Sequence, residues 1–69
     1  MKLDRFDRNG NRIKLGNILK NVYTKDEYEV VFMEDILAFG LMDKYEEFSY
    51  MSEWVPGDWE LIITMMVRP

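Results

Sequence analysis

The spacing of turn residues constrains the fold of this chain more than any other feature of its sequence. Short runs rich in β-branched and aromatic residues alternate with polar or glycine-containing segments, and no segment keeps a 3.6-residue apolar period for long. A helix over residues 33–42 is the main alternative, but Gly40 and the short length disfavour it. The chain is therefore expected to be mainly β. The predicted extended runs cover residues 3–6, 12–15, 18–23, 27–32, 36–42, 47–51 and 59–67.

The segments between these runs carry residues that favour sharp changes of direction. Asn9-Gly10 is the strongest signal, because a tight hairpin needs positive φ angles that Asn and Gly adopt readily. Gly16-Asn17 predicts a second turn or bulge, and Pro56-Gly57 predicts a loop or one 3₁₀ turn. Gly40 predicts a bend or bulge within its run. The remaining turns are expected at residues 25–26, 33–35 and 43–46.

The length of 69 residues allows one domain, residues 1–69. Five or six short strands in such a chain form a strongly bent sheet that closes partly on itself, because a sandwich needs more strands. Alternation along 27–32 puts Tyr28, Val30 and Phe32 on one face, as in a half-buried antiparallel strand. The expected core consists of Ile13, Ile18, Leu19, Tyr28, Val30, Phe32, Leu37, Phe39, Leu41, Phe48, Trp59, Leu61 and Ile63.

The chain contains neither Cys nor His. Thiolate zinc sites, cysteine nucleophiles and histidine general bases are therefore excluded, so we expect no cofactor, no metal and no enzymatic activity. The absence of disulfides favours a cytoplasmic location. The charged N-terminus is unlike a signal peptide, and no run approaches the roughly 18 apolar residues of a membrane span. We therefore expect no membrane partner.

One pattern resembles a cation site but is better explained by a turn. Asp7, Asn9 and Asn11 have the alternate spacing with which a calcium-binding loop begins. Arg12 and Ile18, however, stand where that loop needs Gly and Glu. We therefore expect a hairpin turn at this position.

Charge is distributed unevenly along the chain. Residues 1–25 carry seven cations and two anions, a net charge of +5, whereas residues 26–69 carry two cations and eleven anions, a net charge of −9. Around the first hairpin, cations interleaved with Phe6 form a candidate nucleic-acid-binding face. The main interpretation is a solvated surface, or contact between the two halves, within one chain or head to tail between copies. The candidate basic face comprises Arg5, Arg8, Arg12 and Lys14, and the candidate acidic face comprises Glu27, Glu29, Glu34, Asp35, Asp43, Glu46 and Glu47.

Two apolar features are further candidates for partner contact. Trp54 and Trp59 are candidate interaction aromatics for a peptide ligand; alternatively, one is a core residue that the other covers. The segment 65–67 (MMV) is expected to be a terminal strand or a partner surface.

Several runs together resemble the YopX-like family of phage proteins. DRNGNRIKLGNILK at 7–20 resembles that family's "D-x-N-G-x-x-I-x-x-G-D-I-V" stretch, and EYEVVF at 27–32 resembles its "y-x-V-x-f" strand. AFGL at 38–41 is similar to another apolar strand, and WELI at 59–62 to the late "w-E-V-I" strand. The chain differs at Asn17, where the family usually has Asp, and after Ile62, where "G-N-I" usually follows. The resemblance implies a C-terminal module with an SH3-like β-barrel, from a phage or prophage, and implies no particular activity.

The sequence thus predicts a mainly β, small SH3-like and partly open β-barrel of five to six short antiparallel strands, with at most one short helical turn. We expect a non-enzymatic phage or prophage accessory protein that acts by protein–protein contact with a host or phage protein in the bacterial cytoplasm, and that can form homo-oligomers. Two alternatives stay open. One is a nucleic-acid-binding module that uses the basic hairpin, and the other is an acidic inhibitor that mimics nucleic acid and occupies a host protein.

Overall fold

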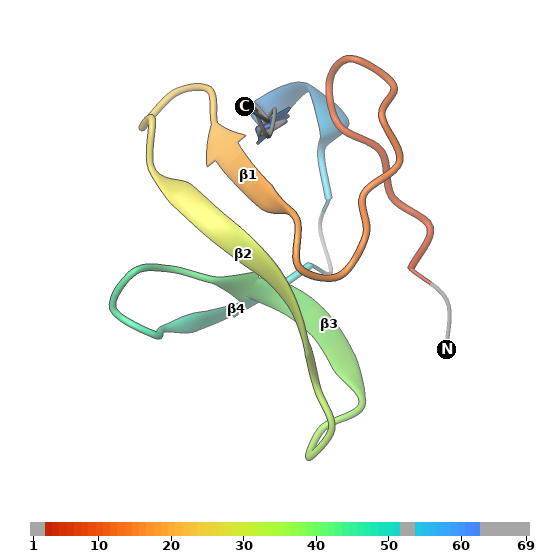
Figure 1. Ribbon diagram of the computed structural model, residues 1–69, viewed down its shortest axis with the longest axis vertical. Helices are drawn as coiled ribbons and strands as arrows, with labels where there is room; N and C mark the ends of the chain where they lie inside the picture. Colours follow the sequence, from red (N-terminus) through yellow and green to blue (C-terminus); the bar gives the residue numbers. More distant parts are fainter. Residues whose placement is uncertain (1–2, 52–53, 63–69) are drawn as a thin grey trace, which may run out of the picture.

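Five short antiparallel strands form one strongly twisted sheet in the order β4-β3-β2-β1-β5 (Figure 1). The computed structural model describes residues 3–51 and 54–62. The elements in chain order are β1 (Ile18–Asn21), β2 (Glu27–Met33), β3 (Ala38–Met42), β4 (Phe48–Tyr50), the 3₁₀ turn η1 (Pro56–Asp58) and β5 (Trp59–Ile62). Over these residues the predicted fold class, a small SH3-like and partly open β-barrel with at most one short helical turn, is confirmed.

Strand pairing makes one face of the sheet apolar across four strands. Leu19 on β1 is paired with Tyr28 on β2 and with Leu61 on β5. Val30 on β2 is paired with Leu41 on β3. Directly paired residues project to the same face, and residues two apart on one strand do so as well. These side chains therefore share the inner face, and the alternate residues of each strand share the outer face.

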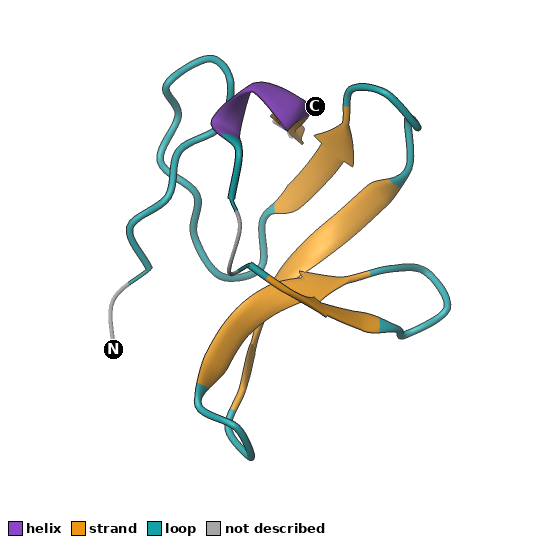
Figure 2. Cartoon of the chain, turned by 180° about the vertical axis from the view of Figure 1, so that it is seen from behind, coloured by secondary structure: helices purple, strands orange, loops and turns teal. Residues whose placement is uncertain are grey.

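The core lies between this inner face and the N-terminal segment. Ile13, which precedes the first strand, is 1% exposed, and Leu19 is 0% exposed. The N-terminal segment therefore closes the open side of the bent sheet, on the same side as η1 (Figure 2). The buried hydrophobic residues are Ile13, Leu19, Val30, Leu41 and Met51, and the residues packed against them are Leu3, Tyr28, Phe39, Trp54, Trp59 and Leu61.

Most of the predicted core residues lie in or against this cluster, but three of the predictions, Leu37, Ile18 and Phe48, are wrong. Leu37 is 64% exposed, because it lies in the turn between β2 and β3 and not in a strand. Ile18 and Phe48 are half-buried on the outer face, because they are paired with Glu29 and Met42. Phe32 is half-buried on the inner face, and Ile63 lies outside the described residues. Met51, whose side chain is 6% exposed, is a core residue that the sequence analysis did not include.

The strand bounds differ from the predicted runs mainly at turns. Residues 34–37 form the β2–β3 turn, so the run predicted for 36–42 begins as a strand only at Ala38. The run predicted for 18–23 ends at Asn21, because the next turn begins there. The two N-terminal runs pair only through the bridge between Phe6 and Arg12. The predicted run at 59–67 is a strand from Trp59 to Ile62, and its remainder lies outside the described residues.

Gly40 does not form a bulge. It continues the regular pairing of β3, opposite Val31 on β2 and Tyr50 on β4. A side chain at this position would overlap the ring of Phe48 and the carbonyl oxygen of Ser49. Gly40 is therefore required by the close approach of β4.

Three turns have the same hydrogen-bonding pattern and backbone geometry. Asp7, Asn21 and Asp43 each begin a turn, and a side-chain oxygen of each accepts backbone N–H bonds from the residues that follow. Each turn also contains a residue with a positive φ, at 83° for Gly10, 69° for Lys25 and 63° for Glu46. Asx residues and left-handed residues together explain these hairpins, because the side-chain bonds replace backbone bonds that the turn cannot make.

Candidate interaction surfaces

The Asp7 turn attaches the N-terminal hairpin to β5. Asp7 is 3% exposed, and its Oδ1 accepts hydrogen bonds from the backbone N–H groups of Asn9 (2.9 Å) and Asn11 (2.8 Å). Its Oδ2 accepts from the backbone N–H of Leu61 at 2.9 Å and from Nδ2 of Asn11 at 3.2 Å. A further bond joins Arg8 N to the Trp59 carbonyl oxygen at 2.9 Å. The expected hairpin turn is confirmed, and its carboxylate is a structural anchor.

Hydrogen bonding controls the ionisation of this carboxylate. Burial by itself would raise the pKa of Asp7, since it disfavours the charged form. The hydrogen bonds from Leu61, Asn11 and Asn9 outweigh that effect and hold the pKa below its ordinary value. Asp7 is therefore a buried anion that stabilises the fold when it is charged.

The two edge strands of the sheet differ in whether their outer backbone groups are hydrogen-bonded. The Asp7 hairpin occupies the outer edge of β5, because Leu61 N and the Trp59 carbonyl oxygen are bonded to it. The outer edge of β4 is paired with no strand in residues 3–51 and 54–62. Asp43 N donates to the Glu47 carbonyl oxygen at 3.1 Å, which places Asp43 and Glu47 in a hydrogen-bonded pair. Because such pairs alternate along an antiparallel ladder, the backbone groups of Phe48 and Tyr50 point away from β3.

The outer face beside this edge is aromatic. The rings of Phe48 and Tyr50 pack edge to face with centroids 5.2 Å apart, and Tyr50 is 62% exposed. Met42 and Val31 lie on the same face of the neighbouring strands by register. An extended segment that paired with β4 would therefore meet an apolar surface as well as free backbone groups.

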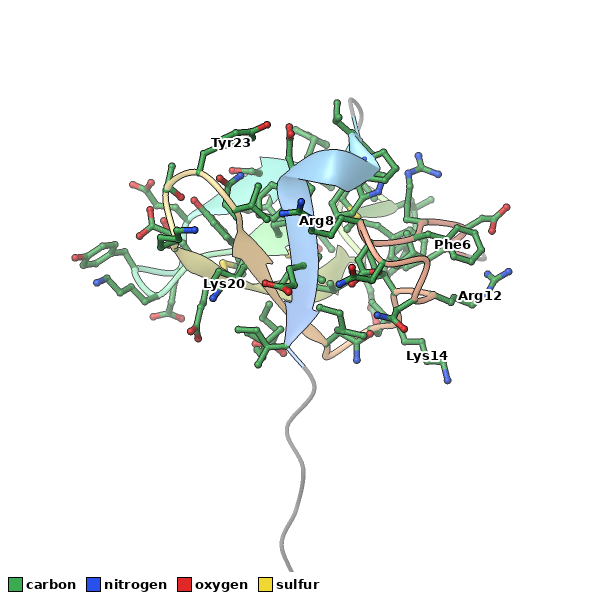
Figure 3. All side chains as sticks on the ribbon, turned by 90° about the horizontal axis from the view of Figure 1, so that it is seen from above. Phe6, Arg8, Arg12, Lys14, Lys20 and Tyr23 are labelled. Atoms are coloured by element: carbon green, nitrogen blue, oxygen red, sulfur yellow. The ribbon has the colours of Figure 1, made fainter. Side chains whose placement is uncertain are left out.

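The structure does not bring the four predicted basic residues together. Arg12 and Lys14 are exposed beside Phe6, whereas Arg8 lies at the tip of the hairpin over β5 (Figure 3). Arg5 is half-buried, and its Nε has no partner among the described residues. We define the basic corner as Phe6, Arg12 and Lys14. There the Arg12 guanidinium lies 5.0 Å from the centroid of the Phe6 ring.

The two predicted interaction aromatics form a stacked pair. The indole rings of Trp54 and Trp59 are 5.6 Å apart and nearly parallel, with an angle of 10°. Trp54 Nε1 donates to the Phe6 carbonyl oxygen at 2.9 Å, and Trp59 packs edge to face against Tyr28 at 5.4 Å. Both indoles pack against the core. Their contacts link the N-terminal hairpin to the inner face of the sheet.

The seven predicted acidic residues form two groups. Glu34 and Asp35 lie at the β2–β3 turn, and the others lie at the start of β2 or in residues 43–47. With a rise of about 3.3 Å per residue, Glu27 and Glu34 are separated by about 23 Å. Glu27, Glu29, Asp43 and Glu46, with Lys44, line a hollow of about 350 Å³ on the outer face, which we define as the acidic hollow.

Similarity to known proteins was tested in three ways. Comparison with family models, curated proteins and solved structures finds no match. The resemblance to YopX-like proteins therefore stays a prediction. Among the described residues, no helix has the length and apolar character needed to cross a membrane.

Sequence reasoning missed two features of these surfaces. The Asp7-Asn-Gly pattern predicted the turn, but nothing nearby in the sequence indicates that Leu61, 54 residues later, would donate to the Asp7 carboxylate. The open edge of β4 was missed because strand order cannot be read from a series of short runs. The acidic hollow could be found in part from sequence, since alternation along β2 places Glu27 and Glu29 on one face.

Proposed function

We propose that this protein is a non-enzymatic protein-binding module that receives an extended segment of its partner at the β4 edge. The observation that carries this proposal is the contrast between the two sheet edges, one occupied by the Asp7 hairpin and one with outward-pointing backbone groups at Phe48 and Tyr50. Strand addition gains affinity from main-chain hydrogen bonds and specificity from alternate side-chain contacts. The partner proposed from the sequence is a phage or bacterial host protein in the cytoplasm.

The aromatic pair would supply the side-chain contacts of this interaction. Exposed edge strands are normally shortened, charged or covered, because they template pairing with other chains. β4 is short, with three residues, but it carries Phe48 and Tyr50 instead of charges. A partner strand could therefore bury the Tyr50 ring while pairing with the backbone.

Proline substitution at Tyr50 tests the backbone part of the proposal. Tyr50→Pro removes an N–H that points away from β3, so the existing ladder keeps its bonds while the edge loses a donor. We expect this variant to lose capture of a partner from bacterial lysate that the wild-type protein captures. Tyr50→Ala, which keeps the donor, should retain part of that capture, and Tyr23→Ala, at another exposed tyrosine, should retain all of it. Undiminished capture by a folded Tyr50→Pro variant contradicts the proposal.

The basic corner supports nucleic-acid binding as a second candidate. Arg12 stacked on Phe6, with Lys14 exposed beside it, offers one aromatic surface and two cations to a single strand. The carboxylate of Asp4, 3.3 Å from Arg12, weakens this candidate. Binding of a labelled single-stranded oligonucleotide should fall steeply with salt and with Arg12→Ala, while Lys20→Ala serves as the control. Absence of binding at low salt eliminates the candidate.

A further inference from the structure

We propose that copies of this protein associate head to tail, with the basic corner of one copy in the acidic hollow of the next. This contact uses neither the backbone edge of β4 nor the Tyr50 ring. Met42 borders both surfaces, but the residues that test the two proposals differ, so either proposal can fail without the other.

The acidic hollow can receive cationic side chains. Four carboxylates and one ammonium group line it, so it carries a net charge of −3. Ile18 and Met42, which lie on the outer face, also line it and provide apolar surface for the aliphatic parts of an incoming side chain. Glu27 and Glu29 are exposed on the outer face of β2 and can approach a neighbouring molecule directly.

The basic corner is complementary to the acidic hollow, because its charge is opposite and both surfaces also have an apolar part. The Arg12 side chain is 42% exposed and Phe6 is 40% exposed, so the stacked pair presents both a cation and an aromatic ring. Lys14 adds a second exposed cation on the same side of the hairpin (Figure 3). Asp4 pairs with Arg12 at 3.3 Å but is itself 68% exposed, so water competes for this ion pair.

The two surfaces lie on opposite sides of one molecule. In Figure 1 the basic corner belongs to the N-terminal segment on the right, and the β3–β4 turn of the hollow is on the left. Figure 3 shows Lys20, which is paired with Glu27, across the molecule from Arg12 and Lys14. One chain cannot bring its own corner into its own hollow, so their complementary charges can meet only between copies.

The geometry of this contact predicts its behaviour in solution. Two different surfaces meet, so the interface is heterologous, and each copy keeps a free surface that can bind another copy. The contact depends on exposed charges, and dissolved salt screens such charges. The distance over which they interact falls from about 30 Å at 0.01 M salt to about 3 Å at 1 M salt. Self-association should therefore be concentration-dependent, extend beyond dimers and weaken with salt.

Sedimentation velocity of the wild-type protein is the first test. We expect the mean mass to rise with protein concentration at low salt, and the apparent association constant to fall at least about tenfold when salt is raised from about 0.01 M to about 1 M. A monomer at every concentration at low salt overturns the proposal. Association that does not change with salt also overturns it, because the contact would then not depend on the two charged surfaces.

A charge exchange between two variants is the decisive test. The variant R12E/K14E makes the basic corner negatively charged and leaves the acidic hollow unchanged. The variant E27K/E29K makes the hollow positively charged and leaves the corner unchanged. Each variant alone should stay monomeric, and an equimolar mixture should assemble again, since opposite charges then meet at every contact. The variant E34K/D35K makes the same charge change as E27K/E29K at the other end of β2, and it should associate like the wild type. The proposal is overturned if both variants fold and their mixture stays monomeric. It is also overturned if E34K/D35K loses as much association as E27K/E29K.

Discussion

The Asp7 turn and the Asp43 turn have the same local geometry in different surroundings. In each, Oδ1 of the aspartate accepts two backbone N–H bonds, from Asn9 and Asn11 in the first and from Tyr45 and Glu47 in the second, at 2.8 to 2.9 Å. The fourth residue of each turn donates to the aspartate carbonyl oxygen, at 3.1 Å in the first turn and 3.0 Å in the second. Five residues therefore suffice to specify this turn twice in one chain.

The two turns differ in what lies beyond them. Asp7 is 3% exposed, and its second oxygen accepts from Leu61 N on β5. The N–H donors to Asp43 lie within its own turn, on residues 45 and 47. The same motif is thus an anchor between distant segments in one place and a local turn in the other. Predictions that compare the two sites test whether this distant contact accounts for the difference.

The largest difference in stability between the two turns should appear when each aspartate carboxylate is removed in a separate variant. Asp7→Ala leaves the part-buried N–H groups of Asn9, Asn11 and Leu61 without an acceptor and should lower the free energy of unfolding by roughly 3 kcal/mol. Asp43→Ala removes only exposed hydrogen bonds within its own turn and should cost about 1 kcal/mol. Urea unfolding followed by circular dichroism measures both values. Equal losses at the two sites would show that the contact with Leu61 contributes nothing.

The left-handed position of the Asp7 turn should tolerate a side chain poorly. Gly10 has a φ of 83°, and no atom beyond the glycine and its two chain neighbours lies within 4 Å of the place that a Cβ would occupy. The cost of Gly10→Ala is therefore a backbone cost, expected at about 1 to 2 kcal/mol. The measurement is the same urea titration, with Gly57→Ala as the control, because that position also has open space but no positive φ. A smaller loss for Gly10→Ala than for the control contradicts this explanation.

The equivalent position of the Asp43 turn should respond in the opposite direction. Glu46 has a φ of 63°, which glycine adopts without steric cost. Glu46→Gly should therefore raise the free energy of unfolding by about 0.5 kcal/mol, offset in part by the greater freedom of glycine in the unfolded chain. Glu47→Gly, one residue later and without a positive φ, should be destabilising. A loss of stability in both variants would count against the equivalence of the two turns.

The smallest expected effect is that of acid, which should gradually reduce the stabilisation that the charged Asp7 carboxylate provides. The pKa of Asp7 in the folded protein lies below its ordinary value, whereas in the unfolded chain it is about 3.9. The unfolded state therefore binds the proton first, and the stabilisation present above about pH 4 is lost as pH falls through the folded pKa. Asp7→Asn cannot titrate, so the difference in unfolding free energy between it and the wild-type protein should narrow as pH falls. A constant difference between pH 6 and pH 2 contradicts the assignment.

Local patterns in the sequence predicted the elements of this fold well. Alternation predicted β2, Asn9-Gly10 predicted the first hairpin, and Pro56-Gly57 predicted η1. The errors occurred where local signals conflict. Leu37 continues an apolar run, yet it lies in a turn with a φ of 49°, because the β2–β3 connection uses residues 34–37. Gly40 was predicted to make a bend or bulge, but no bulge interrupts its pairing, and it is needed for the approach of Phe48 from β4.

The sequence by itself determined most of the strands and turns and the uneven charge, because strand periodicity, Asx turns and glycine conformations depend on neighbours in the chain. Only the tertiary structure decided which of two similar aspartates is buried, which sheet edge is occupied and which charges share a surface. The physical reason is that these outcomes depend on contacts between distant segments, such as Asp7 with Leu61 and Trp54 with Phe6. The separation into +5 and −9 along the chain thus became, in three dimensions, a basic corner and an acidic hollow on opposite sides of one small sheet.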